Sequence, residues 1–108
     1  MARAIIHLPE SARRGEVIEI RALIGHPMET GYRPGADGRV LPRNIIRRFS
    51  CSYNGEQVFS AELHPAIAAN PYIAFQVVAT ESGRLQFTWE GDEGFAQTEE
   101  KSLAVRDA

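Results

Sequence analysis

The sequence contains one cysteine, no long apolar run and no excess of either charge. The lone Cys51 cannot form a disulfide within the chain, and it cannot supply a zinc site built from cysteines alone. No stretch of about 18 apolar residues occurs, so no segment has the length of a membrane-spanning helix. Twelve basic and 14 acidic residues give a formal net charge of −2, which offers no electrostatic reason to bind nucleic acid.

What remains is an ordinary globular composition. The 108 residues are 44% hydrophobic and 24% charged, which predicts one folded domain over residues 1–108 with a single core. The apolar stretch at residues 4–6 is too short for the core of a signal peptide, and Pro9 and Glu10 follow closely. On these signals alone we expect the protein to stay in the compartment where it is made.

Strand patterning recurs along the chain, whereas helical periodicity is nearly absent. In residues 16–24 isoleucine and alanine alternate with charged side chains, as in a strand buried on one face. Residues 44–53 and 56–63 alternate too, and the Asn-Gly pair between them favours a tight hairpin because both residues tolerate a positive φ. Residues 72–80 carry β-branched and aromatic residues on both faces, which predicts a central strand covered on each side. The remaining candidate strands are residues 4–8, 84–89 and 95–105.

This pattern predicts an all-β fold, namely an immunoglobulin-like antiparallel β-sandwich of about seven strands. A small β-barrel is the alternative, and the pattern separates the two poorly. Two segments interrupt the strand rhythm. Residues 25–42 form a long loop rich in glycine and proline, and residues 64–71 lie between two prolines. Loops as long as the first are commonly functional or mobile.

Charges are unevenly distributed along the chain. Five arginines and one aspartate lie within residues 33–48, while residues 90–100 hold five carboxylates and no basic residue. One interpretation is an ordinary solvated surface. The other is a two-signed surface that orients a protein partner, where charge steers association more than it adds affinity.

No catalytic motif is visible, so we expect neither an enzyme nor a cofactor. Cys51 lies on the apolar face of its predicted strand, where burial raises the pKa of a thiol, and it is interpreted as a core residue. The histidines allow one sharper hypothesis. His26, Met28 and His64 could hold copper on a β-sandwich, since imidazole and thioether suit that metal. A small protein that binds copper or iron is therefore the alternative function.

Residues 26–28, His-Pro-Met, partly resemble the iron site of superoxide reductases, another immunoglobulin-like family. That family has a second histidine shortly afterwards and a later Cys-Asn-x-His-Gly segment. Here residues 29–32 contain no histidine, and Asn54 stands where the later segment needs one. An iron site without those imidazoles would be under-coordinated, so this likeness does not predict a metal.

A second resemblance covers nearly the whole chain, from about residue 18 to residue 99. Residues 26–33, His-Pro-Met-Glu-Thr-Gly-Tyr-Arg, and residues 63–72, Leu-His-Pro-Ala-Ile-Ala-Ala-Asn-Pro-Tyr, resemble the SoxZ family. Further matching blocks follow the same order along the chain: residues 42–46, 49–56, 58–61 and 79–83.

The SoxZ resemblance implies a fold, a partner and a compartment. SoxZ chains are immunoglobulin-like sandwiches that form the non-catalytic half of the SoxYZ carrier in thiosulfate oxidation. Their partner SoxY holds the sulfur intermediates on a cysteine in a flexible C-terminal arm. The resemblance therefore implies a heterodimer or higher assembly with SoxY, and transient contacts with other Sox enzymes. It also implies a periplasmic location, reached by export together with SoxY.

The residues expected to bind the partner lie in and just after the long loop. They are His26, Met28, Thr30, Tyr32, Arg33, Arg43 and Asn44. Methionine and tyrosine offer adaptable, amphipathic contacts, and arginines are suited to interfaces. The competing interpretation is that His26, Thr30 and Arg43 satisfy backbone groups that fix the shape of the loop. An uncovered subunit interface would show as self-association of the isolated chain, for example as a homodimer.

Overall fold

The computed structural model describes residues 2–107. Their regular structure consists of strands and one short 3₁₀ turn, η1. In chain order these are β1 (Ala4–His7), β2 (Ser11–Arg13), β3 (Val17–Ile24), β4 (Ile46–Tyr53), β5 (Glu56–Glu62), β6 (Tyr72–Val78), β7 (Gly83–Gly91), η1 (Asp92–Gly94) and β8 (Ala96–Arg106). None of the described residues belongs to a helix with the length and hydrophobicity needed to cross a membrane.

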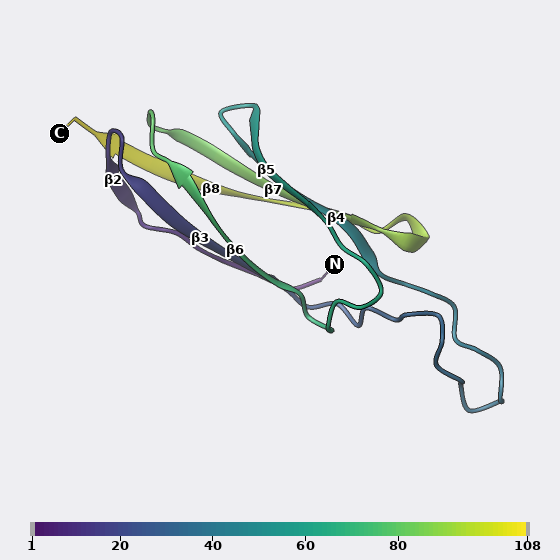
Figure 1. Cartoon of the computed structure of the whole chain (residues 1–108). Helices are drawn as coiled ribbons and strands as arrows, with labels where there is room; N and C mark the ends of the chain where they lie inside the picture. The colour runs from purple at the N-terminus through teal and green to yellow at the C-terminus, as the bar shows by residue number, and fades with distance from the viewer. Residues whose placement is uncertain (1, 108) are drawn as a thin grey trace.

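The strands form two sheets that face each other (Figure 1). The smaller sheet has the order β1-β3-β6, and the larger has the order β2-β8-β7-β4-β5. Neighbouring strands are antiparallel, except that β2 runs parallel to β8. The predicted all-β immunoglobulin-like sandwich is confirmed, and two separate sheets exclude the barrel. The sequence pattern missed β2, because three residues are too few to show an alternation.

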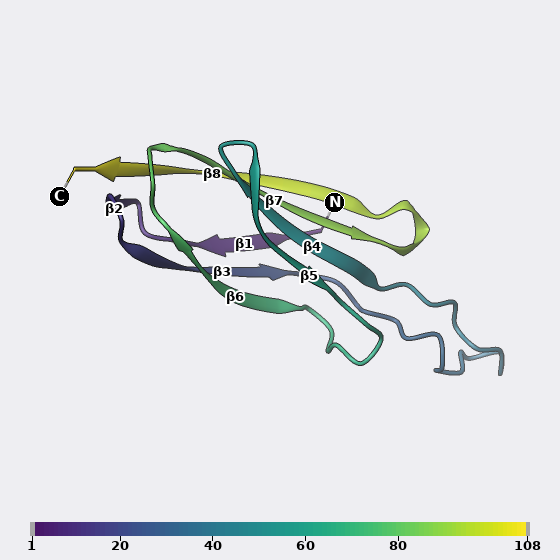
Figure 2. The same ribbon diagram turned by 45° about the horizontal axis from the view of Figure 1, so that its top comes forward.

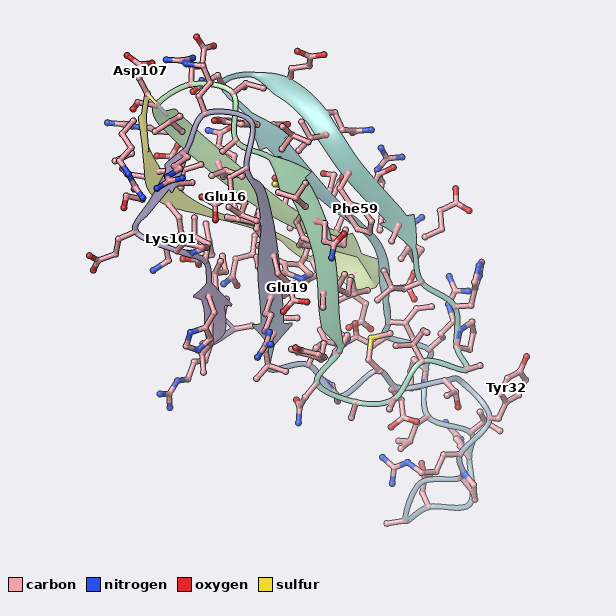
Figure 3. All side chains as sticks on the ribbon, turned by 60° about the vertical axis from the view of Figure 1, so that its left-hand side comes forward. Glu16, Glu19, Tyr32, Phe59, Lys101 and Asp107 are labelled. Atoms are coloured by element: carbon pink, nitrogen blue, oxygen red, sulfur yellow. The ribbon has the colours of Figure 1, made fainter. Side chains whose placement is uncertain are left out.

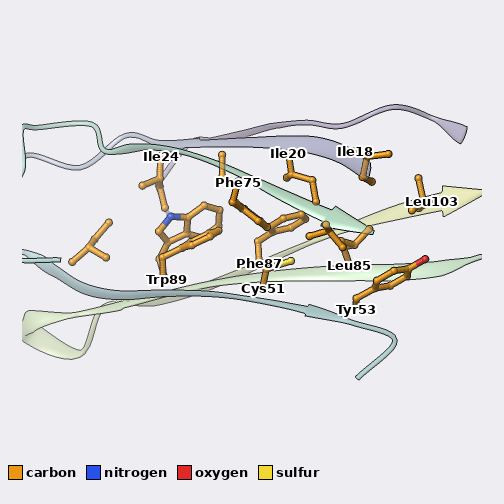
Figure 4. Packing of buried hydrophobic residues seen from close by; sticks show 14 of the residues in the cluster. Ile18, Ile20, Ile24, Cys51, Tyr53, Phe75, Leu85, Phe87, Trp89 and Leu103 are labelled. Carbon is orange, nitrogen blue, oxygen red and sulfur yellow. The ribbon is translucent and has the colours of Figure 1, made fainter. Parts of the chain in front are cut away.

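The core lies between the sheets and combines aliphatic with aromatic side chains (Figure 4). Phe49 is fully buried, and its ring centroid lies 5.2 Å from that of Trp89. Phe59 of the larger sheet stacks on Phe75 of the smaller sheet, with 4.3 Å between the centroids. Aromatic side chains bury the largest apolar areas. The Phe59–Phe75 contact therefore joins the two sheets, whereas Phe49 and Trp89 lie on neighbouring strands of the larger sheet.

The predicted Asn-Gly hairpin is confirmed between β4 and β5. Asn54 and Gly55 have φ values of 49° and 86°, the left-handed conformations that a tight two-residue turn requires. Beside the turn, the Tyr53 hydroxyl accepts hydrogen bonds from the N–H groups of Thr80 (3.3 Å) and Glu81 (3.1 Å) and donates one to the Glu81 carbonyl. This region of the sandwich is called the hairpin end below.

β6 is an edge strand, so the prediction of a central strand covered on both faces was wrong. It pairs with β3 alone. Phe75 and Val77 point into the core, whereas Tyr72 and Val78 on the other face are 58% and 48% exposed. The β-branched and aromatic residues on both faces of this segment predict burial on both faces. In the structure the uncharged residues of its outer face are exposed.

The long loop between β3 and β4 folds back on itself and projects beyond the sheets (Figure 2). At its base, Glu29 and Asn44 exchange two backbone hydrogen bonds of 2.8 Å, and further out Leu41 N–H donates to the Arg33 carbonyl at 2.8 Å. Residues 29–43 are called the finger below. The radius of gyration is 16.4 Å, against about 13 Å for a compact domain of 100 residues. The projecting finger contributes to this elongation.

Candidate functional site

The base of the finger is fixed by His26, which is buried. Its backbone N–H donates to Asn70 Oδ1 at 2.9 Å, and its carbonyl accepts from Asn70 N–H at 2.7 Å. Its ring Nδ1 accepts the Met28 N–H at 2.9 Å, and the ring packs edge-on against Phe95 with centroids 5.1 Å apart. Asn70 lies in the other irregular segment, between β5 and β6. His26 therefore ties the two irregular segments to each other.

The environment of His26 favours its neutral form. Burial lowers the pKa of its imidazole below the usual 6.5, and the nearby Asn44 side chain and Asp92 charge oppose this shift. Only a neutral ring can accept the Met28 N–H at Nδ1. Asn44 Oδ1 is itself buried and has no hydrogen-bond partner. The two side chains lie close together at the end of the sandwich from which the finger projects, which is called the loop end below.

Met28 lies in the core, so its side chain is not available for the exposed partner contact that the sequence predicted. Its side chain is buried, with only 4% of the residue exposed. Its sulfur accepts the backbone N–H of Ile46 at 3.2 Å, at the start of β4. The residue adopts a φ of 50°, an uncommon conformation for a residue with a side chain. Met28 therefore anchors the finger to the sandwich instead of presenting its thioether to a partner.

A second anchor joins the far side of the finger to the turn between β7 and β8. Arg43 binds Asp92 through two hydrogen bonds, Nε to Oδ2 at 2.8 Å and a terminal nitrogen to Oδ1 at 2.9 Å. Asp92 Oδ2 also accepts the Ile45 N–H at 3.2 Å, and Arg47 Nε lies 3.3 Å from Oδ1. The Arg43 hydrogen bond is the largest cause that lowers the pKa of Asp92. These contacts hold the β7–β8 turn against the segment that leads into β4.

These contacts also correct the expectation of a two-signed surface. Arg43 and Arg47 of the basic stretch both bind Asp92 of the acidic stretch. Arg48 lies opposite Glu90 in the β4–β7 ladder. The two stretches therefore meet in space and largely neutralise each other where they meet, although they lie far apart in the sequence.

The accessible part of the predicted site is the outer half of the finger. Tyr32 is 82% exposed and points away from the sheets (Figure 3). Arg33 is exposed and binds Glu29 at 2.6 Å, while Thr30 Oγ1 accepts the Tyr32 N–H at 3.3 Å. Of the seven predicted residues, three are exposed, two are partly buried and two are buried. In that order they are Tyr32, Arg33 and Arg43; Thr30 and Asn44; His26 and Met28.

The residues considered for a metal do not fit one. Among residues 2–107, no three histidine, cysteine, aspartate or glutamate side chains gather as a metal site. His26 Nδ1 and the Met28 sulfur each already accept a backbone N–H, and His64 is exposed. This donor set does not support copper or iron.

Cys51 lies in the core, as the alternation of its strand predicted. It is fully buried, and burial raises the pKa of its thiol to about 12. Since the thiolate is the reactive form, this side chain is inert in the folded protein. It is therefore suited neither to carry a sulfur group nor to form a disulfide between chains.

Several solved structures share the fold at low sequence identity. A superoxide reductase (neelaredoxin) from Ignicoccus hospitalis is 18% identical with a TM-score of 0.75, and covers 97% of this chain and 82% of its own. A putative superoxide reductase from Thermotoga maritima is 17% identical with a TM-score of 0.71, covering 95% and 85%. The sulfur carrier protein SoxY from Chlorobium limicola f thiosulfatophilum is 13% identical with a TM-score of 0.67, covering 95% and 78%. At such identities these likenesses show the fold alone.

The family comparison is more specific. No curated protein matches the sequence significantly. The family model described as sulphur oxidation protein SoxZ matches residues 6–102, which include all of the strands except the first residues of β1 and the last of β8. The family resemblance seen in the sequence blocks is thereby confirmed, and the chain belongs to the SoxZ family.

Proposed function

We propose that this chain is the non-catalytic subunit of a SoxYZ sulfur carrier and that it pairs with SoxY. The observation that carries the proposal is the SoxZ family match over residues 6–102. In such a carrier SoxY holds the sulfur intermediates covalently on a cysteine of its C-terminal arm, and this chain is the folded partner. The buried, protonated thiol of Cys51 is consistent with that division, because it leaves the sulfur chemistry to SoxY.

The finger is proposed to take part in recognition, either of SoxY or of the enzymes that the arm of SoxY visits. Tyr32, Arg33 and Arg43 supply exposed aromatic and cationic groups of the kind enriched at interfaces. His26 and Met28 act indirectly, by holding the base of the finger in one conformation. The complex is proposed to work in the periplasm, where it would arrive by export together with SoxY.

Pairing with SoxY is tested by calorimetric titration of this chain with purified SoxY. The proposal predicts saturable binding of one chain per SoxY subunit, or of a fixed higher ratio. A superoxide reductase with the same sandwich fold serves as the control, and it should not bind SoxY. Absence of binding to SoxY would contradict the proposal, and equal binding of the control would remove its specificity.

The role of the finger is tested with the Arg33→Ala and Tyr32→Ala variants. Arg84→Ala is the matched control, because Arg84 is also exposed and also binds a glutamate, Glu100, at 3.5 Å. If the finger contacts SoxY, the finger variants weaken SoxY binding and the control does not. If it contacts the visiting enzymes, SoxY binding is kept and turnover of the complex with those enzymes falls. Unchanged binding and unchanged turnover would contradict any recognition role.

A further inference from the structure

One edge of the smaller sheet lacks the devices that usually protect an edge strand. Residues 65–80 contain no charged side chain, and they include all seven residues of β6. Exposed strand edges are normally blunted by charge, proline, a bulge or shortness, because their free backbone groups can pair with another chain. The other edge strands follow that rule. β1 and β2 have four and three residues, and β5 carries two glutamates and lies beside a register shift.

The ladder between β3 and β6 shows which backbone groups are free. Ala79 N–H donates to the Glu16 carbonyl at 2.8 Å, and Ile24 N–H donates to the Pro71 carbonyl at 3.3 Å. Because hydrogen-bonded pairs alternate along an antiparallel ladder, the odd-numbered residues of β6 direct their backbone groups to β3. The even-numbered ones direct their N–H and carbonyl groups outward. These are Tyr72, Ala74, Gln76 and Val78.

A groove of about 410 Å³ runs beside the free edge, between β6 and β5. Its apolar lining includes Val78 and Val58, which are 48% and 39% exposed. Glu56 and Glu81 also line it, and no basic residue does. Figure 3 shows the labelled Phe59 between the green ribbon of β6 and the teal ribbon of β5. The edge thus offers free main-chain groups, an apolar surface and two carboxylates together.

We propose that a β-strand of SoxY adds to the free edge of β6 and extends the smaller sheet. This inference rests on the proposed function, and it names the surface through which the two subunits pair. In strand addition the main-chain ladder supplies affinity, and pockets beside it select alternate side chains. The incoming strand places an apolar side chain against Val58 and Val78 and a cationic side chain near Glu56 and Glu81.

SoxY fits this edge better than a second copy of the chain. The solved SoxY has the same sandwich fold over 95% of this chain, so its subunit is built from strands that can pair with β6. A second copy that pairs β6 with β6 would bring an uncharged strand to the groove, since residues 65–80 contain no charge. That strand would supply no cation to Glu56 and Glu81.

The first test is backbone amide hydrogen exchange at single-residue resolution, on the isolated chain and on its complex with SoxY. On complex formation, exchange at Tyr72, Ala74, Gln76 and Val78 should slow by about tenfold or more, as for amides that enter a ladder. The outward amides of Ala4 and Ile6 on the free edge of β1 are the internal control, and their exchange should not change.

The second test uses two lysine substitutions that differ only in their distance from the edge. Val78→Lys places a charge on β6, and Val17→Lys places one directly opposite on β3, where Val17 is 57% exposed on the same outer face. Val78→Lys should weaken SoxY binding by about tenfold or more, because the lysine opposes strand pairing and neutralises the groove carboxylates. Val17→Lys should change the affinity by less than about twofold.

The outcomes separate this inference from the proposed function. A SoxY complex that leaves the exchange of β6 unchanged, or that both lysine variants weaken equally, overturns edge pairing but leaves the subunit pairing intact. Protection of β6 in the isolated chain that disappears on dilution and that SoxY does not affect assigns the edge to a second copy, which also overturns the inference. Failure to form any SoxY complex removes the proposed function itself.

Discussion

The two ends of the sandwich are closed by different kinds of interaction. At the hairpin end, Asn54 and Gly55 make a local turn between adjacent strands, and the Tyr53 hydroxyl holds the neighbouring connection. At the loop end, both anchors of the finger are side-chain contacts between residues that are distant in sequence. Met28 and Ile46 are 18 positions apart, and Arg43 and Asp92 are 49 apart.

This difference assigns different roles to the two ends. A local turn forms whenever its own residues favour it, so the Asn-Gly turn depends little on the rest of the chain, whereas the Tyr53 contacts need β4 and the β6–β7 connection together. The loop end exists only when β4, the β7–β8 turn and the finger are assembled together. It is therefore the end whose shape responds most to substitution and to pH, and the finger that it supports depends on that shape.

The largest expected difference between the ends comes from their close-packed glycines. A Cβ added at Gly91 would lie 2.4 Å from the Ile45 carbonyl oxygen, whereas one added at Gly83 would meet the side chain of Asn54. Gly91→Ala should lower the free energy of unfolding by at least about 3 kcal/mol, because backbone must move. Gly83→Ala should cost less, because a side chain can rotate away. Urea denaturation of both variants measures this, and a larger loss for Gly83→Ala would reverse the comparison.

Met28→Ala tests the anchor of the finger. It removes a buried side chain and the acceptor for the Ile46 N–H, so the free energy of unfolding should fall by about 2–3 kcal/mol. Met28→Leu is the control, since it keeps the volume and removes only the sulfur. Thermal unfolding should show a smaller loss for the leucine variant. A stability of Met28→Ala equal to that of the natural chain would show that Met28 is not an anchor.

Tyr53→Phe tests the hairpin end in the same way. The variant keeps the ring and loses the hydroxyl that binds the Thr80 and Glu81 backbone, so it should cost about 1–2 kcal/mol. Hydrogen exchange should quicken at Thr80 and Glu81 and remain unchanged at Met28 and Ile46. Faster exchange at both ends would mean that the ends are coupled.

The smallest expected effect is a pH dependence that belongs to the loop end. Burial lowers the pKa of His26 in the folded protein below its ordinary value of 6.5. Between the pKa of the folded protein and 6.5, the unfolded chain therefore binds more protons than the folded one. The free energy of unfolding should therefore be fully kept above about pH 6.5 and should fall as the pH decreases through this window. His26→Gln should flatten the dependence in this window. An identical pH profile for the His26 variant would contradict the assignment.

The parts of the fold that follow from neighbouring residues could be predicted. The alternation in β3 and the Asn-Gly turn are local signals, and the structure confirms both. The position of β6 could not be predicted, because its segment carries none of the charges that usually mark an edge strand. β2 was missed because its three residues pair with a strand at the opposite end of the chain.

The candidate site was found only in outline. The length of the loop was a valid signal, but Met28 beside Pro27 has the sequence environment of an exposed loop residue. Its burial depends on the hydrogen bond from the Ile46 N–H to its sulfur and on its left-handed backbone conformation, neither of which the sequence indicates. In the sequence, Asp92 is one of five carboxylates within residues 90–100, and nothing there distinguishes it from the others. Its role depends on its approach to Arg43, which only the assembled fold provides.

Native mass spectrometry of this chain co-expressed with SoxY, after exposure to the thiosulfate-oxidising enzymes, tests whether the two chains form a sulfur carrier. We expect a complex with a fixed ratio of the two chains, with added sulfur mass on SoxY and none on this chain. A chain that remains free of SoxY, or that carries the sulfur mass on Cys51, would show that it is not the non-catalytic subunit of such a carrier.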